Sequence, residues 1–108
     1  MKRVMYFSAA RTDLGDDEVD EIVAAASKRN ALYGVTGALG FNGEAFCQVL
    51  EGDEDDVDKL LETISRDPRH SDFKIVDVKK VTSRAFPDWT MMRVDNLDFQ
   101  HIVDAMRS

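Results

Sequence analysis

The sequence predicts an α+β sandwich, in which two helices cover one face of a mixed, mostly antiparallel sheet. Three features of the chain support this fold class. Short runs rich in β-branched and aromatic residues have the composition of strands. Two segments between them repeat apolar residues at the i, i+3, i+4, i+7 spacing of an amphipathic helix. The dipeptide Asn42-Gly43 is a strong hairpin signal between two of the strand runs. The predicted order is therefore βαββαββ, followed by a short C-terminal helix.

The first strand and the first helix are marked by composition and spacing. Arg3–Ser8 is a run of β-branched and aromatic residues, which predicts a strand. Acidic residues follow a turn and favour a helix N-terminus, so a helix is expected over Asp16–Arg29. Asn30 is expected at the point where this helix stops. The apolar stripe of the helix consists of Val19, Ile22, Val23 and Ala26.

The middle of the chain predicts a hairpin and a second helix. Val35–Phe41 and Ala45–Leu50 are the two strands that the Asn42-Gly43 turn connects. Glu51-Gly52-Asp53 is expected to end the second of these strands and to cap a helix over Glu54–Arg66. The apolar residues of this helix, at the same spacing as in the first, are Val57, Leu60, Leu61 and Ile64.

The last third of the chain predicts two more strands and a short helix. Phe73–Lys80 alternates as a fourth strand, and Ser83–Asp88 is expected to be a loop. Trp89–Val94 is a candidate fifth strand. Asn96 is a candidate cap for a short amphipathic helix over Leu97–Met106.

Composition indicates one globular domain and limits the classes of function. The 108 residues are 44% hydrophobic and 32% charged, and we expect a single domain. With 21 acids against 14 bases, the net charge of −7 argues against a general nucleic-acid-binding surface. No apolar run is long enough for a membrane span. The lone Cys47 allows no internal disulfide, and no paired cysteines suggest a metal site, so a cytoplasmic location is expected.

Gln48 is the first candidate functional residue, because it lies between Phe46 and Leu50 on one face of its strand. Burying its amide without partners costs about 1–3 kcal/mol. Either a polar group lies over this face, or Gln48 bonds to nearby backbone. In a ferredoxin-like arrangement the first and third strands are neighbours at the centre of the sheet. We therefore expect the Tyr6 hydroxyl and the Gln48 amide to meet beneath the two helices.

Alanines make part of the first helix slender. Ala24, Ala25 and Ala26 are consecutive, and alanine is the best helix former, which is a sufficient reason for them. The sharper hypothesis is that the helix is kept thin beside a flat ligand.

Several sequence blocks fall in the order and spacing of one known family. They are Tyr6-Phe7-Ser8, Asn30, Val35-Thr36-Gly37, Phe46-Cys47-Gln48-Val49-Leu50-Glu51-Gly52, Asp67-Pro68-Arg69-His70 and Trp89-Thr90-Met91. With this combination the chain resembles a BLUF domain, a blue-light sensor that uses flavin. The resemblance extends over roughly Lys2 to Val94, so it implies a domain core at about 2–94 and a C-terminal segment at 95–108. The Phe-x-Gln-x-Leu-Glu-Gly block together with the downstream Asp-x-Arg-His is the specific part of the resemblance.

The resemblance implies a flavin, FAD or alternatively FMN, between the two helices and above the central strands. Tyr6 would be the photochemical donor of an electron and a proton, and Gln48 would hydrogen-bond both Tyr6 and the flavin. Asn30 would hold the carbonyl edge of the flavin. Trp89 and Met91 would respond when Gln48 changes its bonds. The other residues implied at the cofactor are Ser8, Ile22, Ser27, Leu39, Phe46, Asp67, Arg69 and His70.

The resemblance also implies a sensor without turnover, which signals to a downstream effector protein or a fused output domain. A homodimer through the sheet face that carries no helices is a further option. Three other classes remain open on the residues alone. They are a flavin-free protein-binding module, a flavin oxidoreductase, which would need a dinucleotide fingerprint that is absent, and an acylphosphatase-like enzyme. The acylphosphatase-like enzyme would need a glycine-rich phosphate-binding loop with an arginine after the first strand. At this place Ser8-Ala9-Ala10-Arg11 supplies the arginine but no glycine.

Overall fold

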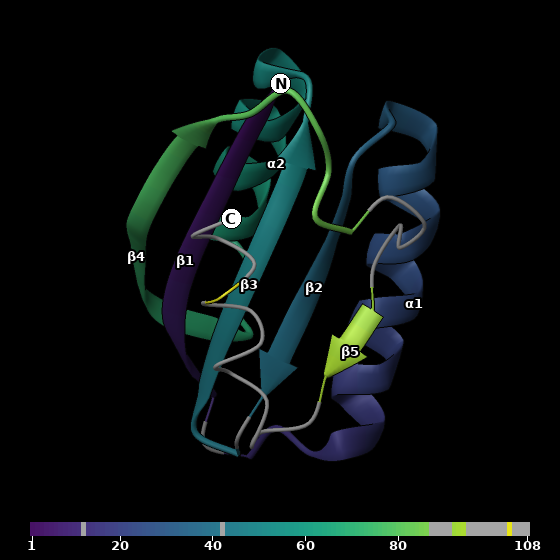
Figure 1. Ribbon diagram of the computed structural model, residues 1–108. Coiled ribbons are helices and arrows are strands. Elements are labelled where there is room, and N and C mark those ends of the chain that lie inside the picture. Colours follow the sequence, from purple (N-terminus) through teal and green to yellow (C-terminus); the bar gives the residue numbers. More distant parts are fainter. Residues whose placement is uncertain (12, 42, 87–91, 95–103, 105–108) are drawn as a thin grey trace.

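Two antiparallel strands, β1 (Lys2–Ala10) and β3 (Ala45–Gly52), form the centre of the sheet. The computed structural model describes residues 1–11, 13–41, 43–86, 92–94 and 104. The strand order is β4-β1-β3-β2-β5 (Figure 1). The remaining elements are α1 (Asp16–Tyr33), β2 (Thr36–Phe41), α2 (Glu54–Ser65), β4 (His70–Lys80) and β5 (Met92–Val94). Only β5 runs parallel to its neighbour, β2, among the described strands. The predicted ferredoxin-like α+β fold is confirmed.

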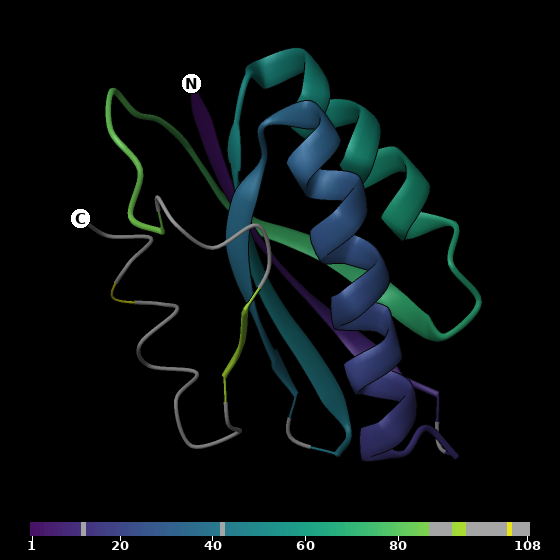
Figure 2. The ribbon, with the colours of Figure 1, turned by 90° about the vertical axis from the view of Figure 1, so that its right-hand side faces the viewer.

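Both helices pack on the same face of the sheet (Figure 2). Val4 and Tyr6 of β1 and Leu50 of β3 meet Val19 of α1 and Val57 of α2 in one buried cluster. These are the residues that the alternation of the strands and the helical stripes predict to share a layer. The main core therefore lies between the helices and the sheet.

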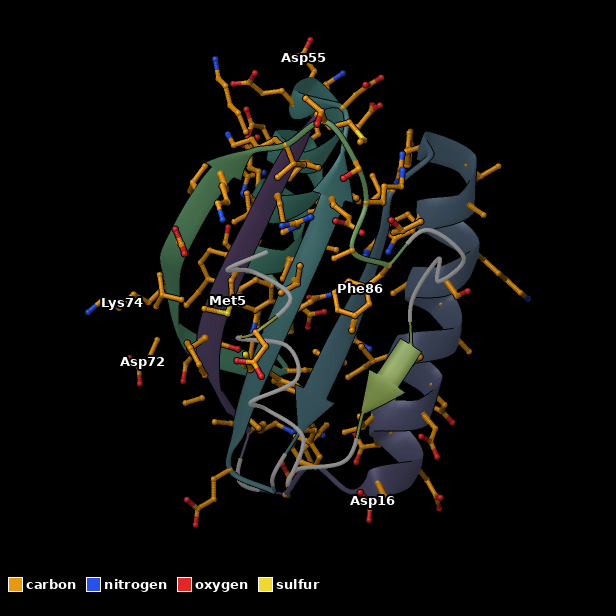
Figure 3. The ribbon with its side chains drawn as sticks, viewed as in Figure 1. Met5, Asp16, Asp55, Asp72, Lys74 and Phe86 are labelled. Atoms are coloured by element: carbon orange, nitrogen blue, oxygen red, sulfur yellow. The ribbon has the colours of Figure 1, made fainter. Side chains whose placement is uncertain are left out.

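The opposite face of the sheet carries a smaller apolar cluster. Met5 of β1 and Cys47 and Val49 of β3 are buried there together with Ala38 of β2. Phe86, from the segment that follows β4, is only 3% exposed and belongs to the same cluster (Figure 3). Figure 2 shows this segment on the side of the sheet away from the two helices. A second, smaller core therefore lies against β1, β2 and β3 on this face.

Helix α1 is longer than predicted. It continues to Tyr33 and ends at Gly34, whose positive φ of 67° suits glycine and whose N–H bonds the carbonyl of Asn30. The prediction that the helix stops at Asn30 was wrong, because Ala31, Leu32 and Tyr33 are all compatible with a helix. Asn30 is instead fully buried in the last turn.

Strand β3 is also longer than predicted. Glu51 and Gly52 do not break it: they pair with Arg3 and Lys2 of β1. The prediction took a Glu-Gly pair for a turn, but Glu51 is fully buried and finds its partners on other segments. Asp53 is the N-cap residue of α2 by position, and its side chain makes no capping hydrogen bond.

Strand β4 departs from simple alternation. It begins at His70, three residues before the predicted start, and its register against β1 shifts between Met5 and Tyr6 and again between Phe7 and Ala9. Each irregularity moves the following side chains to the other face. Ile75 and Val78 pair with Tyr6 and Val4 of β1, yet both are exposed, as is Val76, because β4 is an edge strand. Phe73 packs on the main core.

The end of the chain falls largely outside the described residues. This holds for the predicted strand at positions 89–91 and for the predicted helix Leu97–Met106, apart from position 104. Within the described residues no helix is long and apolar enough to cross a membrane.

Candidate functional site

A cavity lies between α1, α2 and the face of the sheet that the helices cover. It opens to solvent, and its empty space, with the open mouth included, is about 550 Å³. Both apolar and ionisable side chains line it. They are Tyr6, Ile22, Ala25, Ala26, Arg29, Leu39, Phe46, Gln48, Ile64, Asp67, Arg69 and His70.

Tyr6 and Gln48 form the polar centre of the sheet side of this cavity. The two residues are directly paired across β1 and β3, and both are buried. The Tyr6 hydroxyl donates a hydrogen bond to Gln48 Oε1. The predicted meeting of the phenol and the amide is confirmed. Because Oε1 accepts this bond, the donor end of the amide is Nε2, and the two ends of Gln48 have opposite hydrogen-bonding roles.

Burial keeps the Tyr6 phenol protonated. Desolvation raises the pKa of Tyr6 well above its ordinary value of 10.0, and the Arg29 charge opposes this rise only in part. Tyr6 also packs against Phe73, with ring centroids 4.6 Å apart. The site therefore presents a neutral phenol that holds its proton against an amide oxygen.

His70 connects the cavity wall to two elements. Its Nε2 lies 2.5 Å from the carbonyl oxygen of Ile64, near the end of α2, and its Nδ1 lies 2.7 Å from the Ser8 hydroxyl on β1. A carbonyl can only accept, so Nε2 carries the ring proton, and in the neutral ring Nδ1 accepts from Ser8. His70 therefore holds the C-terminal end of α2 against the sheet beside the cavity.

Asp67 and Arg69 form a bidentate ion pair at the cavity wall. Arg69 Nε lies 2.9 Å from Asp67 Oδ1, and Arg69 Nη2 donates to Oδ2. The backbone N–H of Arg69 also bonds Asp67 Oδ1, at 2.9 Å. The hydrogen bond from the Arg69 side chain holds the pKa of Asp67 below its ordinary value, although burial acts in the opposite direction. The pair fixes the direction of the Arg69 guanidinium.

Helix α1 supplies a thin wall and one cation. Ala25 and Ala26 line the cavity where the helix passes over it, with Ile22 one turn before them. Arg29 lines the cavity too, and its Nε is buried without a hydrogen-bond partner among the described residues. A buried donor of this kind costs free energy until an acceptor meets it. The α1 wall therefore suits a flat ligand that carries hydrogen-bond acceptors.

The structure brings together most of the residues that the sequence suggested. Ser8 lies behind the cavity wall, under His70, and does not line the cavity. Asn30 is buried and Ser27 half-buried on α1, and neither lines the cavity. Trp89 and Met91 lie outside the described residues, so their signalling role stays a prediction. Those at the cavity are Tyr6, Ile22, Leu39, Phe46, Gln48, Asp67, Arg69 and His70.

Four lining residues, Ala25, Ala26, Arg29 and Ile64, were not among the predicted site residues. Ile64 was predicted only as part of the apolar stripe of α2, and nothing in its spacing separates a core position from a cavity wall. Ala25 and Ala26 had a partial signal. The alanine run suggested a thin helix, whereas Arg29 was predicted as the last residue of that helix.

Comparison with known proteins decides the family. The family model described as BLUF, sensors of blue light using FAD, matches residues 1–92. The chain belongs to the BLUF family. This BLUF domain is therefore a flavin-binding sensor of blue light. Among curated relatives, it is 40% identical over 75 residues to the blue light- and temperature-regulated antirepressor BluF of Escherichia coli (strain K12), which covers 69% of this chain. It is 34% identical over 87 residues, 80% of this chain, to the photoactivated adenylate cyclase subunit beta of Euglena longa.

Solved BLUF structures have the same fold. The dark-state structure of the BLUF protein BlrB superposes with a TM-score of 0.85 at 34% identity, covering 98% of this chain and 81% of BlrB. A bacterial light-regulated adenylyl cyclase gives a TM-score of 0.85 at 28% identity, covering 98% of this chain and 35% of the cyclase. The chain spans 18% of the length of the Escherichia coli relative and 10% of the Euglena longa relative.

The residues at the cavity fit a flavin. An isoalloxazine ring is flat, and the cavity has the alanine wall of α1 on one side and Leu39 and Phe46 of the sheet on another. The ring edge carries carbonyl and nitrogen acceptors, which match the buried Arg29 Nε. Flavin binding is therefore consistent with both the shape and the donor set of the site.

Proposed function

We propose that this BLUF domain is a reversible blue-light switch centred on Tyr6 and Gln48. The observation that carries the proposal is the hydrogen bond from the Tyr6 hydroxyl to Gln48 Oε1 on the sheet side of the cavity. Bound flavin supplies the absorption of blue light and, when excited, a strong oxidant. The neighbouring phenol, kept neutral by burial, is the group that gives an electron and then its proton.

Gln48 is the part of the switch that changes. While Tyr6 Oη holds its proton, it keeps Gln48 Oε1 as an acceptor and so sets the direction of the amide. When that bond is lost, the amide can rotate or tautomerise and exchange its donor and acceptor ends at little steric cost. The electron and the proton would return to Tyr6, and a hydrogen bond from Gln48 to a carbonyl of bound flavin would shift the absorption slightly to the red. No substrate is consumed, so the domain moves between two hydrogen-bond arrangements and is not itself an enzyme.

The cofactor proposed is FAD, with FMN as the alternative. FAD carries a diphosphate, which needs positive charge near the mouth of the site. Arg29 and Arg69 line the cavity, and Lys28 and Arg66 are exposed close to them in the sequence. Loading the protein with FAD, FMN and riboflavin separately, and comparing the dissociation constants, tests this choice.

The output is proposed to go to a separate effector protein or to a fused output domain. In the photoactivated adenylate cyclase subunit beta of Euglena longa the matched part is 10% of the protein, so most of that relative lies outside the segment similar to this chain, which supports this proposal. We propose that residues of about 2–94 form the sensor and that 95–108 form a C-terminal segment, with Trp89 and Met91 relaying the change at Gln48. The buried lone thiol of Cys47 suits the proposed cytoplasmic location.

Light-minus-dark absorption spectra of two variants test the switch. Tyr6→Phe keeps the ring that fills the space, so it should retain flavin and lose the red shift. Gln48→Leu should also retain flavin and fail to shift. Tyr33→Phe is the matched control, because Tyr33 is 52% exposed at the end of α1.

Two results would contradict the proposal. A normal reversible red shift in the Tyr6 or the Gln48 variant would remove that residue from the mechanism. Absence of retained flavin after the wild-type protein has been loaded with excess FAD would overturn the cofactor assignment.

A further inference from the structure

A buried carboxylate lies on β3 close to the switch, on the opposite face of the sheet. Glu51 is three residues after Gln48, and the alternation of the strand directs it to the face of Cys47 and Val49. It is fully buried. The proposed photochemistry does not use it, so its contacts require a separate explanation.

Both carboxylate oxygens of Glu51 accept hydrogen bonds from other segments. Oε2 lies 3.1 Å from Arg3 Nε on β1 and 3.0 Å from the backbone nitrogen of Ala85. Oε1 lies 2.5 Å from the backbone nitrogen of Phe86 and 3.4 Å from Thr36 Oγ1 on β2. The carboxylate therefore joins three strands to the segment that follows β4.

Two arginines strengthen this junction. Arg3 Nη2 donates to the Ser83 carbonyl at 3.3 Å, so it holds the same segment from β1. Arg84 donates to Thr36 Oγ1 at 2.8 Å, to the Glu51 carbonyl at 3.1 Å and to the Gly34 carbonyl at 2.6 Å. We call the contacts of Glu51 with Arg3, Thr36, Ala85 and Phe86 the Glu51 clamp.

The clamp fixes where the chain lies on the far face of the sheet. Phe86, held at its backbone by Glu51, is part of the buried cluster that contains Cys47 and Val49. Farther along the chain, β5 (Met92–Val94) pairs with β2. Apolar residues would bury this face at least as well, because a buried ion pair gains little stability over an apolar replacement. The polar clamp therefore points to a role in placing the 83–86 segment.

We propose that Glu51 is a positioning residue that couples β3 to the 83–86 segment, so that a change at Gln48 reaches the far face of the sheet. This inference rests on the proposed switch at Tyr6 and Gln48. Gln48 and Glu51 lie on the same strand and face opposite sides of it. A small displacement of β3 therefore moves the acceptor of the Ala85 and Phe86 amides.

Amide hydrogen exchange in the full chain, loaded with FAD, tests the clamp. In Glu51→Gln one carboxylate oxygen becomes an NH2 group, and both oxygens face donors, so either orientation of the amide loses hydrogen bonds. The Ala85 and Phe86 amides should exchange about ten-fold faster in the dark than in wild type. Light should change their exchange in wild type. In Glu51→Gln this light-dark difference should be lost while the red shift remains, a pattern that a merely structural role would not produce.

Two further variants keep the test decisive. Glu51→Gln leaves the Arg3 charge buried without its carboxylate, which can prevent folding. The double variant Arg3→Met/Glu51→Gln removes that charge and should give the same exchange pattern. Glu21→Gln, an exposed position on α1, is the matched control and should behave as wild type.

Each contrary result has a defined meaning. Unchanged dark exchange of Ala85 and Phe86 in the folded variants overturns the clamp. The coupling is overturned if light does not change the exchange of the Ala85 and Phe86 amides in wild type, or if the change persists in the Glu51 variants. It is also overturned if a variant retains flavin but loses the red shift. If wild type itself shows no red shift, both the proposed switch and the coupling are refuted. The exchange of the Ala85 and Phe86 amides in the dark still tests whether the clamp exists.

Discussion

Gly37 on β2 should tolerate no side chain, because β2 and β3 approach closely at this point. A Cβ added there would lie 1.9 Å from the carbonyl oxygen of Val49 and 3.0 Å from its carbonyl carbon. Both are backbone atoms, so relief requires the two strands to separate. Overpacking of this kind costs about 1–3 kcal/mol or more, and we expect Gly37→Ala to lie at the upper end, about 3 kcal/mol. For a domain of this size that corresponds to a melting temperature lower by about 12 °C or more.

The effect should extend to the flavin site. Leu39, two residues after Gly37, pairs directly with Gln48. Separation of the strands would displace Gln48 from Tyr6, so flavin affinity should fall together with stability. Thermal unfolding with and without added FAD distinguishes the two effects, because a ligand stabilises only the folded state that binds it.

A second glycine provides the control for Gly37→Ala. A Cβ at Gly15, the N-cap of α1, would meet nothing within 4 Å. Gly15→Ala should therefore cost no more than about 1 kcal/mol, the scale of an N-cap preference. Equal stabilities of the two variants would refute the argument from the close approach of β2 and β3.

Two further predictions concern protonation. Because burial raises the pKa of Tyr6, the folded protein keeps a proton that the unfolded chain loses above about pH 10, so the free energy of unfolding should decline above that pH. Burial also raises the pKa of Cys47 to about 12, so Cys47 adds to this decline from about pH 9. Tyr6→Phe should remove only the part of the decline that is due to Tyr6. An identical decline in wild type and Tyr6→Phe would refute the assignment. For His70, nitrogen chemical shifts of the neutral ring should show the proton on Nε2, facing the Ile64 carbonyl, whereas a proton on Nδ1 would contradict the described contacts.

Local pattern was sufficient for the elements and for the central pair of the site. Alternation placed Tyr6 and Gln48 on the helix-covered faces of their strands, and the element order made those strands neighbours. Helical spacing likewise identified the stripes of α1 and α2 that pack on the sheet. These predictions succeeded because periodicity expresses which face of an element is buried, and each segment contains that information by itself.

Element ends were less predictable. Asn30 resembled a helix end, yet the helix continued until Gly34 could adopt a left-handed conformation. The pairing of β4 with β1 contains irregularities at which the alternation of β4 is lost. The residue types of β4 did not predict these irregularities. Where an element stops or bulges depends on the partner that takes its backbone hydrogen bonds.

The sequence by itself determined the fold class, the adjacency of the first and third strands and the meeting of Tyr6 with Gln48. Burial patterns within short segments identify the elements, and the ferredoxin-like order of these elements makes the first and third strands neighbours. Only the tertiary structure decided that Glu51, part of an apparent turn, is a buried acceptor for Arg3 and the Phe86 amide. It also decided that His70 joins Ile64 to Ser8. The physical reason is that a buried polar group must be paired, and its partners lie on segments far away in the chain, where local pattern carries no information about them.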